Sequence, residues 1–178
     1  MIKITLPDGS VKEFAKGVTP MDVAKSISEG LARNVISASF DGVTIETSTA
    51  LIADGSLVLY TWNDKEGKKA FWHSTSHVMA QVLEEMYSGI KLTLGPAIDN
   101  GFYYDVDFCE EKISEVDFKK IEDRILEISR EKHEFKLWPV SKAEALSLYK
   151  GNEFKTELIE NLEDGTITFC DHSSFTDL

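Results

Sequence analysis

The fold of the N-terminal part of the chain is decided by the stretch IKITLPDGS at residues 2–10. Residues 2–6 alternate apolar and polar side chains, which is the pattern of a half-buried β-strand. Residues 7–10 are a strong turn signal, because proline presets one backbone angle and glycine tolerates a positive one. Residues 11–14 can then return as the second strand of a hairpin.

Outward from this hairpin, the pattern continues with a helix and further strands. Thr19 and Pro20 predict a helix start, with threonine as the N-cap and proline at the first helical position. Residues 36–45 contain two short strands around an Asp-Gly turn, and residues 56–60 predict a closing strand. One helix on a small mixed sheet is a ubiquitin-like β-grasp arrangement, which we expect for residues 1–61.

A second domain is expected at residues 62–178. It begins with a polar, glycine-containing stretch at residues 63–69 that predicts a linker. The three lysines of this stretch are interpreted as solvated side chains; an RNA-contacting patch is the alternative. They are Lys65, Lys68 and Lys69.

The second domain is predicted to mix helices and strands. A helix is expected at residues 74–86, and two more begin at capping boxes, Ser114 with Asp117 and Ser141 with Glu144. The expected strands are short apolar runs beside turn residues: a hairpin around Asn100-Gly101, residues 135–140 and residues 166–170. This pattern predicts an α+β domain with a mostly antiparallel sheet.

Composition favours a cytoplasmic globular protein. The chain has 178 residues, of which 42% are hydrophobic, as in ordinary soluble domains. No apolar run approaches the roughly 20 residues of a membrane span, and the N-terminus has no apolar signal stretch. Membrane contact is therefore not expected. The cysteines, Cys109 and Cys170, have no C-x-x-C spacing and are expected to be free thiols.

The charge of the chain argues against a broad nucleic-acid surface. The net charge is -12, whereas phosphate binding requires basic side chains. Residues 1–61 hold 5 Lys and Arg against 7 Asp and Glu, and residues 62–178 hold 14 against 24. Any RNA contact is therefore expected to use a local basic patch or a shaped pocket.

Two histidines are the first candidates for chemistry. His73 and His77 are four residues apart at a predicted helix start, which places both rings on one face. Such a pair can bind a metal or hold a water molecule and move protons. The residues between them are Ser-Thr-Ser, so the glutamate of a metalloprotease motif is missing. Taken alone, this spacing is more often structural.

The stretch GPAIDNGFYYD at residues 95–105 strengthens the histidine pair. Glycine permits close backbone approach, and the clustered aromatic side chains offer a stacking surface for a nucleobase. A hairpin whose aromatic residues fill a core is the structural alternative.

Together these stretches resemble a known family. The chain is similar over its whole length to the N-terminal half of bacterial threonyl-tRNA synthetases. Residues 1–61 resemble the TGS domain, through TLPDGS at residues 5–10 and TPMDVA at residues 19–24. Residues 62–178 resemble the editing domain, which hydrolyses seryl-tRNA made in error on threonine tRNA.

The resemblance implies roles for six residues. His73 and His77 would lie at the water molecule and the scissile ester. Lys155 and Asp177 match positions that line the site, and Asp177 would hold the seryl amine. The two substrate-binding residues would be Tyr104, which stacks on or flanks the terminal adenine, and Gly95, which makes a backbone contact.

Two departures from the family pattern bear on these roles. Trp72 stands where many relatives have arginine. The family continues after Leu178 with a Cys-x-x-x-His segment that would complete the editing site. We therefore expect the chain to be a piece of a longer protein, lacking the aminoacylation and anticodon-binding domains.

The resemblance also implies partners and cofactors. The partner would be threonine tRNA, with its 3′ end in the editing site. ATP, magnesium and zinc would belong to the aminoacylation domain, and no cofactor or metal is expected within these 178 residues. The full-length protein would be a homodimer, and the chain alone a monomer.

Two other functions remain open from the sequence. One is a non-catalytic β-grasp module for regulation or RNA docking. The other is a zinc hydrolase that uses His73, His77 and a cysteine, although no third ligand stands at a recognised spacing.

Overall fold

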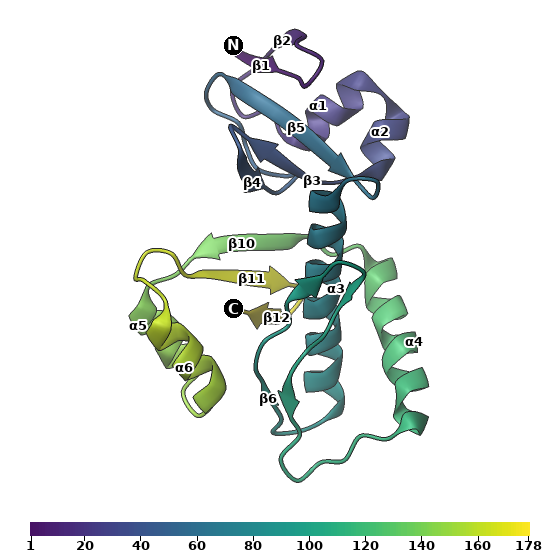
Figure 1. The fold of residues 1–178 in the computed structure, drawn as a ribbon, viewed down its shortest axis with the longest axis vertical. Coiled ribbons are helices and arrows are strands. Elements are labelled where there is room, and N and C mark those ends of the chain that lie inside the picture. Colours follow the sequence, from purple (N-terminus) through teal and green to yellow (C-terminus); the bar gives the residue numbers. More distant parts are fainter. The chain divides into compact units, whose positions relative to one another are not determined.

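The computed structural model describes residues 1–178 and forms two compact units, Met1–Phe71 and Trp72–Leu178 (Figure 1). Helix α3, Lys65–Met86, begins in the first unit and continues in the second. The sequence placed the boundary after residue 61, where the last strand of the first sheet ends. Both histidines of the candidate pair belong to the second unit.

The first unit is a five-stranded mixed sheet with two short helices. Its strand order is β2-β1-β5-β3-β4, with β1 and β5 parallel and the other neighbours antiparallel. In chain order, the elements are β1 (Ile2–Thr5), β2 (Val11–Phe14), α1 (Pro20–Ile27), α2 (Glu29–Asn34), β3 (Val35–Phe40), β4 (Val43–Ile45) and β5 (Gly55–Thr61). This is the predicted β-grasp fold, with α2 as an addition.

The alternating pattern of the first strand is what builds this core. Ile2 and Ile4 are buried on one face of β1, and they pack with Leu57 of β5 and Val23 of α1. Burying one such aliphatic side chain stabilises the fold by about 1.5–3 kcal/mol. The apolar face of the sheet is thereby covered by helix α1.

Helix α1 begins where the sequence predicted. Thr19 is the N-cap, and its side chain accepts a hydrogen bond from the backbone N of Asp22. The Asp22 carboxylate accepts in return from the backbone N of Thr19 at 3.2 Å. This reciprocal capping box satisfies backbone donors that the first turn of a helix leaves unpaired.

The predicted linker at residues 63–69 is wrong. Helix α3 already begins at Lys65, and Asp64 holds its start by accepting from the backbone N of Thr61 at 2.7 Å. Gly67 contributed to the prediction of a linker, but glycine at this position has a packing reason. A Cβ atom there would overlap the carbonyl oxygen of Thr61 and lie 2.8 Å from the carbonyl carbon.

Substituting Gly67→Ala is expected to destabilise the first unit. The added methyl group must displace the backbone of Thr61, and overpacking of this kind costs about 1–3 kcal/mol. Gly30→Ala is the matched control, because the nearest atom to a Cβ there is Ser28 Oγ at 3.9 Å. Urea denaturation should show a lower unfolding midpoint for Gly67→Ala alone; equal midpoints would contradict the packing argument.

The second unit has the predicted α+β character, and all of its strand pairs are antiparallel. Its largest sheet has the order β10-β11-β12. After α3, its elements are β6 (Lys91–Leu92), β7 (Ala97–Ile98), β8 (Gly101–Phe102), β9 (Val106–Asp107), α4 (Glu115–Glu131), β10 (Phe135–Pro139), α5 (Lys142–Leu148), α6 (Glu153–Asn161), β11 (Thr168–His172) and β12 (Phe175–Asp177).

Helix α3 lies in the middle of the second unit (Figure 1). Val82 packs against Ile128 of α4 in one apolar cluster, and Ala80 packs against Phe175 of β12 in another. Both residues of α3 are fully buried. Because α3 packs against both α4 and β12, the positions of its side chains relative to β12 are fixed.

The sequence missed two elements that later prove important. It placed the last strand at residues 166–170, whereas β11 runs over Thr168–His172 and is followed by β12. The chain reverses between them at Ser173, whose φ is 56°, with no glycine to signal the turn. Helix α6 was also unpredicted.

No helix in the chain combines the length and the apolar character needed to cross a membrane.

Candidate functional site

Two histidine rings meet on helix α3, as their spacing predicted. The ring centroids of His73 and His77 are 4.6 Å apart, with the planes at 70°. Their Nε2 atoms are 3.3 Å apart, within hydrogen-bond distance. His77 is only 4% exposed, whereas His73 is exposed. The pair therefore joins a buried ring to one that solvent reaches.

The carboxylate of Asp177 is the centre of a buried hydrogen-bond cluster. Its Oδ2 accepts from His77 Nδ1 at 2.9 Å and from the Tyr104 hydroxyl at 2.8 Å. Its Oδ1 accepts from Lys155 Nζ at 2.6 Å and from the backbone N of Leu178 at 2.9 Å. Asp177 is 2% exposed, so protein donors replace water around it.

Local structure explains how Lys155 and Asp177 arrive at the same point. Asn152 caps helix α6 by accepting from the backbone N of Lys155, which places the lysine in the first turn. Asp177 lies on β12 in register with Cys170 of β11. A lysine and an aspartate 22 residues apart thus form a buried ion pair.

The cluster holds Asp177 in its charged form. Burial raises the pKa of Asp177, but the hydrogen bond from His77 and the charge of Lys155 lower it by more, so the net pKa lies well below its usual range. Burial, followed by the charge of Asp177, raises the pKa of Tyr104 and of Tyr149 above the usual phenol value. At neutral pH, the carboxylate therefore accepts hydrogen bonds and both phenols keep their protons.

The depressed pKa of Asp177 predicts an acid-sensitive fold. A carboxyl whose pKa is lower in the folded chain contributes stability that is complete above its unfolded pKa of about 3.9 and is lost as the pH falls below it. We expect the free energy of unfolding to fall between about pH 6 and pH 3 by more in the natural chain than in Asp177→Asn. Urea denaturation at both pH values measures this difference; equal losses would contradict it.

A second contact fixes the 95–105 segment to α3. The Ser76 hydroxyl lies 2.9 Å from the carbonyl oxygen of Gly95 and 2.7 Å from that of His73. Gly95 also lies against the ring of Tyr104: a Cβ atom there would overlap the ring edge and lie 3.1 Å from Cγ. Glycine is therefore needed for Tyr104 to reach Asp177.

Substituting Gly95→Ala is expected to destabilise the second unit by about 1–3 kcal/mol, because the ring of Tyr104 must move away from Asp177. In a Tyr104→Ala background, the same substitution should cost little, since the ring it collides with is gone. A double-mutant cycle of unfolding free energies measures the coupling; additive effects would show that the two residues do not interact.

The structure brings all six predicted site residues into one connected cluster. His73, His77, Lys155, Asp177 and Tyr104 are linked directly by hydrogen bonds, and Gly95 joins through its contact with Tyr104. The hairpin predicted around residues 100–101 is confirmed as β7 and β8. The chemical roles of these residues stay predictions.

Two further members of the cluster were missed. Tyr149 was not among the predicted site residues, yet its hydroxyl lies 3.4 Å from Asp177 Oδ1. Ser76 is fully buried; a small polar residue on the inward face of a helix was the available signal. Next to this cluster, His172 Nδ1 lies 2.9 Å from Oε1 of Gln81, which is one helical turn after His77 on α3. The pKa of His172 is lowered, mainly because the ring is buried.

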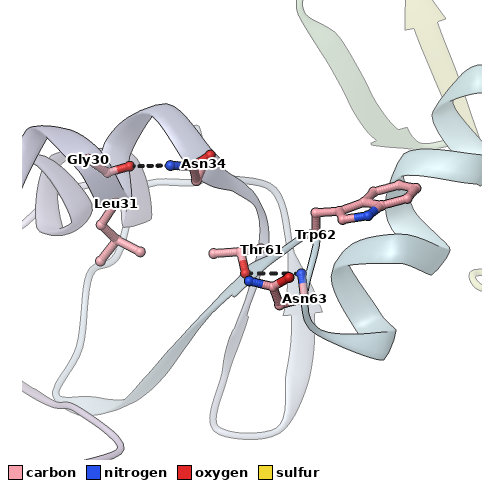
Figure 2. A pocket seen from close by; sticks show the side chains of 6 residues that line it. All are labelled: Gly30, Leu31, Asn34, Thr61, Trp62 and Asn63. Atoms are coloured by element: carbon pink, nitrogen blue, oxygen red, sulfur yellow. Dashed lines mark hydrogen bonds between the residues drawn. The ribbon is translucent and has the colours of Figure 1, made fainter.

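The first unit contains a pocket of about 360 Å³, shown in Figure 2. Its polar groups already bond within its own wall: the Asn34 amide donates to the carbonyl oxygen of Gly30, and the backbone N of Asn63 donates to Thr61 Oγ1. The second unit has another pocket, of about 420 Å³, lined by polar residues: Lys132, His133, Glu134, Lys136, Asp171 and Ser173.

Cys109 is exposed and Cys170 is buried, and both are free thiols, as the sequence predicted. Residues 1–178 contain no group of three or more His, Cys, Asp or Glu side chains arranged to hold a metal ion.

Of the comparisons with known proteins, the family model covers only the N-terminal part of the chain, whereas the similar proteins cover all of it. The family model described as TGS domain matches residues 2–60. The whole chain is 82% identical to a threonine--tRNA ligase of Flavobacterium psychrophilum and 79% identical to one of Flavobacterium johnsoniae. It is 48% identical to the threonine--tRNA ligase of Cytophaga hutchinsonii. In each comparison, the chain is covered completely but spans only 28% of the relative.

Proposed function

Because residues 2–60 form a TGS domain and the whole chain is similar to the N-terminal region of threonine--tRNA ligases, we propose that residues 72–178 clear mischarged tRNA. The reaction is hydrolysis of the ester between serine and the terminal adenosine of threonine tRNA. The observation that carries this proposal is the buried cluster in which Asp177 joins Lys155, Tyr104 and the His73–His77 pair.

Such a reaction has a physical rationale in a threonine--tRNA ligase. Serine lacks only the methyl group of threonine, and one such group in a pocket discriminates by only about 1–3 kcal/mol. A second, smaller site can admit the serine ester and exclude the threonine ester. When the two sites act in succession, their ratios of discrimination between threonine and serine multiply.

The histidine pair supplies the proton transfers that ester hydrolysis needs. A water molecule gives a proton to a histidine while its oxygen bonds to the ester carbonyl carbon. The bond from that carbon to the ribose oxygen then breaks, and the ribose oxygen takes up the proton. Asp177 holds the seryl amine and Lys155 lines the site beside it. The ring of Tyr104 flanks the adenine, and Gly95 contributes a backbone contact.

The proposal extends to the longer protein of which the chain would be part. That protein would attach threonine to its tRNA with ATP, with magnesium and zinc in its aminoacylation domain, and would act as a homodimer in the cytoplasm. Residues 1–178 would contribute the TGS domain and most of the editing domain. A Cys-x-x-x-His segment after Leu178 would complete the site.

The test is deacylation of purified seryl-tRNA and threonyl-tRNA, both on threonine tRNA, by the complete ligase with these residues at its N-terminus. We expect rapid loss of serine and retention of threonine. The same ligase with residues 1–178 deleted is the control and should spare both. Equal rates for the two ligases would contradict the proposal and favour a non-catalytic docking module.

A further inference from the structure

The first two turns of helix α3 carry three lysines that form no salt bridge. Lys65, Lys68 and Lys69 are three and four residues apart, so their side chains lie on one face of the helix. All three belong to the first unit, and none of them takes part in a salt bridge of the chain. Because α3 begins at Lys65, the helix fixes the spacing of these lysines, which a flexible linker would not do.

The opposite face of these turns is fixed to the first unit. Gly67, on the other side of the helix from the lysines, packs so closely on Thr61 that a Cβ atom would lie 2.8 Å from the carbonyl carbon. The Asp64 carboxylate is occupied by Thr61, whose backbone N and hydroxyl donate to it at 2.7 Å and 2.9 Å. Glu66 is the remaining carboxylate of these turns. The lysine face is therefore directed away from Thr61 and keeps a net positive charge.

An exposed aromatic side chain adjoins the lysines. Trp62 is 44% exposed, and its ring centroid lies 5.8 Å from Lys68 Nζ. An edge-to-face contact with Phe71, at 5.1 Å between ring centroids and 86° between planes, supports the indole. Figure 2 shows the Trp62 ring directed away from Leu31. Ammonium groups beside an exposed indole are the combination that binds the phosphates and bases of a single RNA strand.

The charge of the first unit permits an RNA contact there. Residues 1–71 hold 8 Lys and Arg against 9 Asp and Glu, whereas residues 72–178 hold 11 against 22. RNA binding depends on basic side chains that replace the counterions of the phosphates, so an acidic surface opposes it. The first unit is nearly neutral, and three of its basic side chains gather on one face of α3. Charge complementarity therefore favours an RNA strand as the occupant of this face.

We propose that Trp62, Lys65, Lys68 and Lys69 form a basic-aromatic surface that binds the phosphate backbone of threonine tRNA, with one unpaired base stacked on the indole. The inference rests on the proposed function for the identity of the RNA, because threonine tRNA is the RNA that the longer protein would handle. None of the four residues belongs to the cluster around Asp177. The surface holds the tRNA and takes no part in the hydrolysis.

The lysines are tested by fluorescence anisotropy of labelled, unacylated threonine tRNA titrated with the 178-residue chain at several salt concentrations. Replacing all three with glutamine should weaken binding on the order of 10–100-fold and reduce the salt dependence of log Kd by about one unit per lysine. The control replaces Lys3, Lys12 and Lys16, around strands β1 and β2, and removes the same charge. Equal weakening in both variants, or no binding by the natural chain at low salt, would overturn the proposal.

The indole is tested in the same titration, with thermal midpoints as the check on folding. Trp62→Ala should weaken binding on the order of 10-fold, and Trp62→Phe, which keeps a stacking ring, should retain most of the affinity. Ile52→Ala removes another exposed apolar side chain of the first unit and should bind as the natural chain does. If Trp62→Phe binds as weakly as Trp62→Ala while both stay folded, the stacked base is wrong.

An acidic protein is the other polyanion that could occupy the surface. Poly-glutamate is therefore titrated against the bound tRNA, and it should displace the tRNA poorly because it has no bases to stack on Trp62. Displacement by poly-glutamate as effective as that by unlabelled tRNA would overturn the assignment to RNA.

The surface and the hydrolysis fail separately. In the complete ligase, the triple lysine variant should raise KM for seryl-tRNA more than the control triple variant does. If the natural ligase releases no serine but the three lysines still govern tRNA binding, the hydrolytic function is wrong and the surface stands. If serine is released while the lysine variant keeps the natural Kd and KM, only the surface is wrong.

Discussion

Replacing Asp177 with alanine is expected to lower the free energy of unfolding of the second unit by about 3–5 kcal/mol. The loss is large because Lys155, with 3% of its side chain exposed, would be left in a buried site without its carboxylate partner. His77 would lose the acceptor of its Nδ1 proton. Urea denaturation of the 178-residue chain measures the change.

Two variants check that the unpaired charge is the cause. The double variant Asp177→Leu with Lys155→Met removes both charges and should recover part of the lost stability, as apolar replacements of buried ion pairs often do. Asp164→Ala removes an exposed carboxylate and should change stability far less. If the double variant is as unstable as Asp177→Ala, packing and not charge explains the loss.

Substituting His73→Ala in the complete ligase is expected to slow the release of serine from seryl-tRNA by on the order of 10²–10⁴-fold. The variant removes the exposed ring of the pair but leaves the buried contacts of His77 with Asp177 in place, so the fold should be little affected. Release of serine from labelled seryl-tRNA is measured over time, together with the thermal midpoint of each protein.

His133→Ala is the matched control for this substitution, because His133 lies outside the cluster and pairs with Glu131. It should release serine at the natural rate. A His73→Ala ligase with undiminished serine release would refute the catalytic role of the pair, and a large fall in its thermal midpoint would mean that the exposed ring is structural.

Much of the fold could be predicted because local signals were strong. The hairpin at the N-terminus, the capping box at Thr19 and the boxes at Ser114 and Ser141 all lie where the pattern put them. Each depends on residues close in sequence. Local hydrogen bonds and alternating burial are sufficient to define such elements.

The failures came where packing contacts override the preference that the local sequence suggests. Gly67 favoured a linker because its packing against the carbonyl group of Thr61 cannot be seen in the sequence. Strand β12 is only three residues long, too short for alternation to signal it.

The candidate site likewise combines residues that a local pattern marks with residues that meet only after folding. The four-residue spacing of His73 and His77 correctly predicted rings on one helical face. Lys155 and Asp177 were named only through the family resemblance, because no local pattern marks a lysine and an aspartate that meet after folding. The full set of donors around Asp177 could be found only in the structure.

The contact between His77 and Asp177 joins residues 100 positions apart in the chain. Contacts between residues so far apart in the sequence form late in folding, because the entropy cost of closing the long loop precedes the stabilisation that the contact provides. A ribosome must synthesise nearly all of the second unit before the histidine pair can acquire its acceptor. Nascent chains therefore carry both histidines before the contact between His77 and Asp177 exists, and the buried cluster forms only when nearly all of the second unit has been synthesised and has folded.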